Sequence, residues 1–166
     1  INATIKGASY TGTWVFTGNS NAVDLLCSSQ SAGNCDTVAL NITTTGDDNT
    51  FDFDIGEVGS ADNSTIGFTI TGDNNIINSD IDGVSAAVSV TIDNSSSLST
   101  NSSNSDEGVT LDLDIDGAGD VNGHTFTLDV TGGGGTIDVT QSGVYDNTID
   151  LDMTGDDFDV DISQTD

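Results

Sequence analysis

Aspartate is the residue that offers this chain most of its chemistry. The sequence holds 28 acidic residues against a single Lys or Arg, for a formal net charge of −27. Hard cations such as Ca²⁺ choose carboxylate oxygens as ligands. The candidate cation ligands are turn or strand aspartates, namely Asp47, Asp48, Asp73, Asp112, Asp114, Asp156 and Asp157. Bound Ca²⁺ and a purely solvated acidic surface, screened by salt, are the two open interpretations, and no other cofactor is expected.

The same charge excludes several classes of partner. A strongly acidic surface repels nucleic acid and anionic lipid, so neither is expected to bind. No stretch approaches 18 consecutive apolar residues, and we therefore expect no membrane-spanning helix.

Catalysis has few residues on which to depend. His124 is the only histidine and Lys6 the only basic side chain. A Ser-His-Asp triad would need His124 as its base, but this residue directly precedes an alternating run and is better explained as a turn or strand-edge histidine. Phosphoryl transfer lacks a cationic clamp, and carbohydrate cleavage lacks exposed aromatic residues. We expect no enzymatic activity.

Cys27 and Cys35 are the only cysteines, with seven residues between them. We predict one disulfide that closes a small loop and contributes roughly 2–3 kcal/mol. Such a bond is typical of the cell surface or the extracellular space. The sequence opens with Ile1, so we expect that a leader was removed or that the sequence was trimmed. Five sequons are candidate glycosylation sites, at Asn2, Asn41, Asn63, Asn94 and Asn101.

A short repeat must position these residues. The pattern G-x-x-N-x-Φ, in which Φ is apolar, begins at Gly18, Gly46 and Gly72, and each of these glycines follows a threonine. Looser copies begin at Gly33, Gly59, Gly119, Gly132, Gly143 and Gly155. Glycine and asparagine tolerate the backbone angles of tight turns. The repeat therefore predicts a series of equivalent turns.

Apolar residues alternate with polar ones after these turns. The runs include Val38-Leu40-Ile42, Phe51-Phe53-Ile55, Ile66-Phe68-Ile70, Val88-Val90-Ile92, Leu111-Leu113-Ile115, Phe126-Leu128-Val130, Ile149-Leu151-Met153 and Phe158-Val160-Ile162. Period-two alternation predicts strands with one buried side. We expect a single all-β domain over 1–166 with almost no helix, interrupted by a Ser/Asn-rich loop or degraded repeat at 95–106.

Two all-β architectures fit the strand spacing. A β-sandwich or jelly roll, with a donated strand, has no reason to repeat its turn sequence. A β-solenoid does, because equivalent turns stack about 4.8 Å apart. We therefore favour a solenoid of two strands per coil, with roughly 24 residues in each coil.

The repeat resembles that of the curlin family of bacterial amyloid-type surface fibres, whose pattern is Q-x-G-x-x-N-x-A. Gly18 with Asn21, Gly46 with Asn49 and Gly72 with Asn75 have the internal spacing of that pattern, although the glutamine is missing from these three copies. Gln141 and Gly143 provide the nearest match to its beginning. The resemblance implies stacked two-strand repeats and a role in surface fibres.

Self-assembly is the function that these features favour. Solenoid edges invite further strands unless they are blocked, and this chain has no proline and one lysine. Residues 1–17 form an N-terminal cap or a donated strand, and Trp14, Val15 and Phe16 are candidate assembly residues. We expect a structural subunit of an extracellular filament or matrix fibre, with other copies of the chain as partners. A virion or surface-layer component and a cation-dependent adhesin are the alternatives.

Overall fold

The computed structural model describes residues 1–6, 9–27, 35, 37–56, 62–83, 85–93, 108–116, 123–143 and 147–165. These residues form strands and turns with no helix. The strands are β1 (Asn2–Ile5), β2 (Thr11–Thr17), β3 (Ala22–Cys27), β4 (Ala39–Thr45), β5 (Thr50–Ile55), β6 (Thr65–Thr71), β7 (Ile76–Asp82), β8 (Ala87–Asp93), β9 (Val109–Asp116), β10 (Thr125–Ser142) and β11 (Thr148–Thr165).

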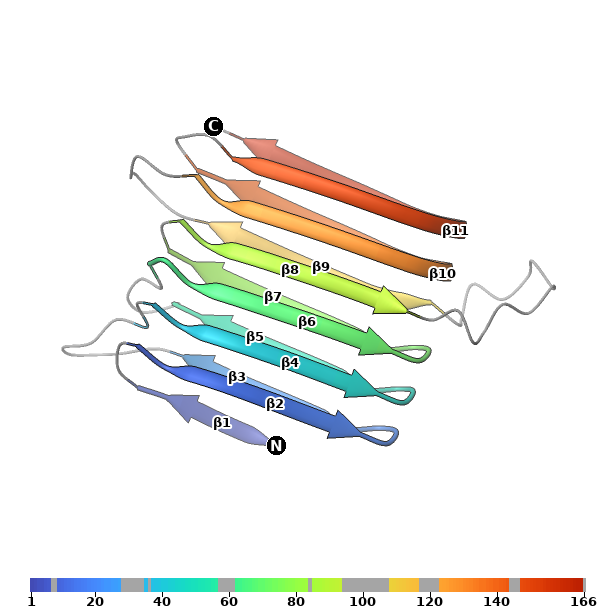
Figure 1. The fold of residues 1–166 in the computed structure, drawn as a ribbon, viewed down its shortest axis with the longest axis horizontal. Helices are drawn as coiled ribbons and strands as arrows, with labels where there is room; N and C mark the ends of the chain where they lie inside the picture. Colours follow the sequence, from blue (N-terminus) through green and yellow to red (C-terminus); the bar gives the residue numbers. More distant parts are fainter. Residues whose placement is uncertain are drawn as a thin grey trace.

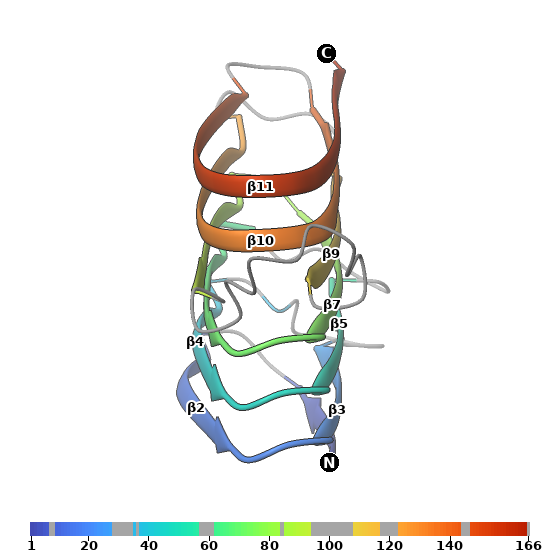
Figure 2. The same cartoon turned by 90° about the vertical axis from the view of Figure 1, so that its right-hand side faces the viewer.

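The strands form a parallel β-solenoid with two walls (Figure 1). We call β2, β4, β6 and β8 the first wall, and β1, β3, β5, β7 and β9 the second wall. The longer strands β10 and β11 bend through both walls, as Figure 2 shows in a side view of the stack. Every pairing is parallel. The predicted solenoid is thus confirmed, and the sandwich alternative is not observed.

Successive coils stack in register. Residues that bond across neighbouring coils lie 28 residues apart for Asn21 and Asn49, and 26 apart for Asn49 and Asn75. The separation is 38 residues between Ala86 and His124, and 23 between His124 and Asn147. The predicted value of roughly 24 residues per coil therefore holds for some coils and underestimates others.

Alternating side chains fill a thin core between the two walls. Every apolar run predicted to face inward does so, and those in the middle coils are at most 3% exposed. Aromatic rings pack along the core, with centroid distances of 5.4 Å from Phe16 to Phe51, 5.9 Å from Phe51 to Phe53 and 5.4 Å from Phe53 to Phe68. Inward side chains of the two walls pack together in one core, so each wall depends on the other for its burial.

A ladder of asparagines joins successive coils at the tight turns. The Asn49 side chain is 0% exposed, and its Nδ2 donates to Gly46 O at 3.0 Å and to Asn75 Oδ1 at 2.9 Å. Its own Oδ1 accepts from Asn21 Nδ2 at 2.8 Å. Gly46 has a φ of +128°, and a Cβ there would lie 2.5 Å from Gly18 O. The repeated Gly and Asn are therefore required by backbone conformation and by buried hydrogen bonding.

A second ladder lies at the opposite edge of the walls. His124 is 2% exposed. Its Nδ1 accepts from Ala86 N at 3.1 Å, and its own N donates to Asn147 Oδ1 at 2.9 Å. Asn147 Nδ2 donates to Gly143 O at 3.2 Å. The copy of the repeat predicted at Gly143 therefore belongs to this edge rather than to the edge of Gly18, which corrects its assignment as an equivalent turn.

Two predicted elements differ from the other copies of the turn. The copies at Gly132 and Gly155 lie within the continuous strands β10 and β11, so the turn assigned to Asp156 and Asp157 is a bend of β11. The predicted loop at 95–106 lies outside the described residues.

Candidate functional surfaces

Aspartates form columns on the outside of the second wall, which we call the aspartate face. One column runs Asp24, Asp52, Asn78, Asp112, Asp138 and Asp161 through paired strands. A second runs Asp54, Asp80 and Asp114, and a third pairs Asp82 with Asp116. Neighbouring carboxylates therefore lie one strand spacing apart, about 4.8 Å, which brings like charges together.

Burial and the neighbouring carboxylates together raise the pKa of two carboxyls on this face, those of Asp80 and Asp114. Burial, followed by the charges of Asp82, Asp114, Asp54 and Asp116, raises the pKa of Asp80 to about 6. Burial and neighbouring carboxylates, with Asp116 the largest of these, also raise the pKa of Asp114. Ser142 Oγ donates to Asp116 Oδ1 at 2.6 Å. Protons or cations would relieve the repulsion at this face.

The predicted turn ligands lie elsewhere. Asp47, Asp48 and Asp73 gather at the tight turns, where Asp73 N donates to Asp47 Oδ1 at 3.0 Å and Asn74 Nδ2 donates to Asp48 Oδ1 at 3.3 Å. Asp112 and Asp114 belong to the aspartate face instead. The side chains of Asp156 and Asp157 lie outside the described residues. Within the described ranges, no group of three His, Cys, Asp or Glu side chains is arranged to hold a metal ion.

The outside of the first wall carries threonines, and we call it the threonine face. One column runs Thr17, Thr45, Thr71, Asp93, Thr131 and Thr154. The next runs Val15, Thr43, Thr69, Thr91, Asp129 and Asp152. Strands β2, β4, β6 and β8 contain a single acidic residue, Asp93, whereas β3, β5, β7 and β9 contain eight.

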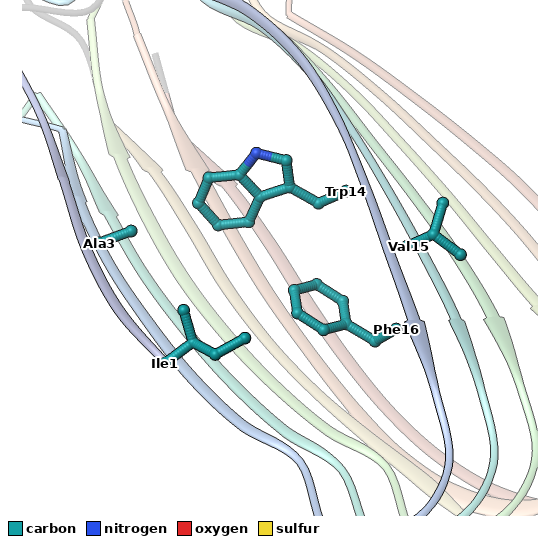
Figure 3. A pocket seen from close by; sticks show the side chains of 5 residues that line it. All are labelled: Ile1, Ala3, Trp14, Val15 and Phe16. Carbon is teal, nitrogen blue, oxygen red and sulfur yellow. The ribbon is translucent and has the colours of Figure 1, made fainter.

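An apolar pocket of about 280 Å³ opens at the N-terminal end of the solenoid. Figure 3 shows Trp14 and Phe16 of β2 pointing toward Ile1 and Ala3, whereas Val15 points away. Trp14 Nε1 donates to Tyr10 OH at 3.1 Å. The predicted assembly residues therefore divide: Trp14 and Phe16 line the end of the core, and Val15, 66% exposed, belongs to the threonine face.

The C-terminal end also exposes its interior. Leu151 and Val160 of β11 lie in register with the buried Leu128 and Ile137 of β10, yet they are 40% and 38% exposed. Inward side chains of this rung are exposed because β11 pairs only with β10 in the described part of the chain, so no further rung packs over them. Both ends of the solenoid thus present apolar side chains beside an edge strand.

The remaining predicted sites have simple locations. Cys27 and Cys35 form the predicted disulfide, and each is 1% exposed. Asn2, Asn41 and Asn63 are exposed, as glycosylation would require. Asn94 and Asn101 lie outside the described residues. Burial lowers the pKa of His124, and its contacts give it a place in the ladder between coils.

Sequence reasoning did not identify the threonine face. The signal was present, because each turn glycine of the main repeat follows a threonine, and these threonines form one column of that face. A single threonine performs no distinctive chemistry, so the repeated Thr-Gly pair does not by itself indicate a site. Only the stacking of coils brings these threonines together on one surface.

Within the described part of the chain, no helix combines the length and apolar character that crossing a bilayer requires. Comparisons with protein-family models, with curated proteins and with solved structures find no match to this chain.

Proposed function

We propose that this chain is a structural subunit that stacks end to end into an extracellular filament or matrix fibre. One observation carries this function: the apolar interior reaches the surface at both ends. Among the described residues, five large apolar side chains are exposed, and three of them, Ile1, Leu151 and Val160, lie where the interior opens at an end rung. Burying these side chains against a second copy would stabilise the joint.

The end strands supply the backbone part of such a joint. In the described structure β1 pairs only with β3 and β2 only with β4, so each keeps one edge for a further strand. The β1 rung has no described strand opposite it on the first wall. A strand added there by another copy would pair with β2 and cover the pocket beside Trp14 and Phe16.

Charge favours joining unlike ends. Residues 1–17 contain Lys6 and no acidic residue. Strand β11 instead carries six aspartates, at Asp150, Asp152, Asp156, Asp157, Asp159 and Asp161. The N-terminal end of one copy is therefore electrostatically matched to the C-terminal end of the next. Copies stacked along one axis do not close into a ring, so repeated heterologous contacts of this kind produce a filament. The curlin-like repeat and the disulfide, which is typical of oxidising compartments, support this function.

Electron microscopy of negatively stained protein, at low and high salt, tests the filament directly. Leu151→Asp and Val160→Asp place a charge at the C-terminal end and should abolish filaments. Ile76→Asp is the matched control, because Ile76 is 39% exposed but lies in the middle of the solenoid. Circular dichroism should verify that each variant keeps its β structure. Monomers under all salt conditions, or equal loss in all three variants, would contradict end-to-end stacking.

A cation-dependent adhesin is the second candidate, favoured by the aspartate columns. Bridging cations would offset the repulsion around Asp80 and Asp114. Calorimetric titration with Ca²⁺, together with the shift in melting temperature, tests this function. Heat of binding and a raised melting temperature, both reduced by Asp80→Asn, would support it; no shift at millimolar Ca²⁺ would exclude it.

A further inference from the structure

Six threonines form a compact block on the threonine face, in the part of β2, β4, β6 and β8 nearest the tight turns. We call this block the threonine patch. It consists of Thr17, Thr43, Thr45, Thr69, Thr71 and Thr91, in two adjacent columns of β2, β4, β6 and β8. Five of them are exposed and Thr43 is half-buried. Figure 1 shows these four strands side by side and running in the same direction. The patch is therefore an ordered array rather than a scatter of surface residues.

The spacings of this array are set by the backbone. Rungs of a parallel sheet lie about 4.8 Å apart, and outward residues of one strand follow at about 6.6 Å. Threonine is β-branched, so its χ1 rotation is restricted and neighbouring side chains adopt similar orientations. The patch thus repeats one hydroxyl and one methyl group in two dimensions, with spacings close to those of water oxygens on a prism face of ice.

The charge distribution argues against macromolecular occupants. The six threonines carry no charge that could attract the acidic side of another copy, so side-by-side contact between copies has no electrostatic attraction to favour it. Nucleic acid and anionic membranes are repelled by the same charge. Aromatic side chains that could stack on sugar rings, such as Trp14 and Phe68, are turned toward the core. A neutral ligand with a regular surface meets none of these obstacles.

We propose that the threonine patch binds the surface of ice. Each hydroxyl both donates and accepts hydrogen bonds with water, and the methyl groups between them hold water weakly. Water ordered over the array matches the crystal at many points simultaneously, so weak single contacts add up. Aspartates, which hydrate strongly, lie mainly on the opposite face. In the two columns of β2, β4, β6 and β8, only Val15 and Asp93 stand in place of threonine, and Asp93 is the only acidic residue. This activity does not depend on filament formation.

Microscopy of single ice crystals grown in the presence of the protein tests this activity. Thr69→Tyr with Thr71→Tyr disrupts the patch without adding charge. Thr50→Tyr with Thr136→Tyr is the matched control, because both threonines are exposed on the aspartate face. Circular dichroism and melting temperature establish that each double variant is folded, and sedimentation velocity records its association state.

The expected result is faceted, slowed crystal growth with the unaltered protein and with the control. The patch variant should lose this effect while remaining folded. Unrestricted growth with the unaltered protein, or equal loss in both double variants, would overturn the proposal. So would self-association that depends on the patch, because the array would then be an interface between copies.

Discussion

The two faces of this solenoid share one interior and differ almost completely outside it. Strands of the first wall present threonines and a single aspartate up to β8, whereas the matching strands of the second wall present eight aspartates. Both walls bury alternate side chains to the same degree. The inward residues and the turn asparagines therefore specify the fold, and the outward residues are free to specialise.

The difference also shows what stacking does to a residue type. Repetition places like beside like, so an isolated surface aspartate becomes a column of repelling charges. The same repetition makes threonine a neutral array without a comparable penalty. The aspartate face thus lowers stability at neutral pH, and the threonine face does not.

A core substitution should destabilise both walls together, because they share one interior. Phe53 is fully buried between the walls and packs on Phe51 and Phe68. Phe53→Ala should lower the free energy of unfolding by about 3–5 kcal/mol, measured by chemical denaturation. Asp52→Ala, the outward neighbour, is the control and should change it by less than about 0.5 kcal/mol. Similar effects of the two substitutions would mean that the core does not hold both walls.

Breaking the asparagine ladder that joins successive coils should have the next largest effect. Asn49→Ala removes a buried amide and deprives Asn21 N of its acceptor, Asn49 Oδ1, whereas Asn75 Oδ1 keeps only the bond from the backbone N of residue 49. We expect a loss of about 1–3 kcal/mol in the free energy of unfolding. Asn78→Ala, at an exposed position of the aspartate face, is the matched control and should have little effect. An equal loss at Asn78 would argue against the role of the ladder.

Acidification should stabilise the aspartate face selectively. The folded pKa of Asp80, about 6, lies above its ordinary value of 3.8, so the folded state binds the proton more tightly than the unfolded state does. Stability from this carboxyl is absent at about pH 7, grows as the pH falls through 6, and is complete near 4.

Asp80→Asn should therefore melt at a higher temperature than the unaltered protein at about pH 7, with the difference vanishing near pH 4. Taking the difference between the two proteins cancels the opposite contribution of His124, whose pKa is lowered by burial. Asp150→Asn, on the threonine face, controls for the removal of one charge. A melting difference for Asp80→Asn that does not change with pH would contradict the assignment.

The smallest effect on the free energy of unfolding should come from adding one aspartate to either face. Asn78 lies between Asp52 and Asp112 in the aspartate column, so Asn78→Asp should cost about 0.2–1 kcal/mol through repulsion, and less at high salt. Thr69→Asp lies between Thr43 and Thr91 on the other face and should cost less. Denaturation at two salt concentrations measures both variants. Equal losses of stability in the two variants would show that repulsion between neighbouring carboxylates in the aspartate column is negligible.

Local patterns in the sequence determined much of this fold. Alternation identified the inward residues because a strand turns successive side chains to opposite sides. The recurring Gly and Asn identified the turns that stack, and the short separation of Cys27 and Cys35 predicted their disulfide. These features depend on neighbours in the chain, so the sequence alone reveals them.

Only the tertiary structure decided which outward residues become neighbours. Coils are unequal in length, with 38 residues between Ala86 and His124 but 23 between His124 and Asn147, so register could not be counted along the chain. Hydrogen bonds between strands set that register and separated the threonines from the aspartates. They also placed Asp47 and Asp112, both predicted cation ligands, on different surfaces. Proximity between coils is a property of the stack, and no local pattern encodes it.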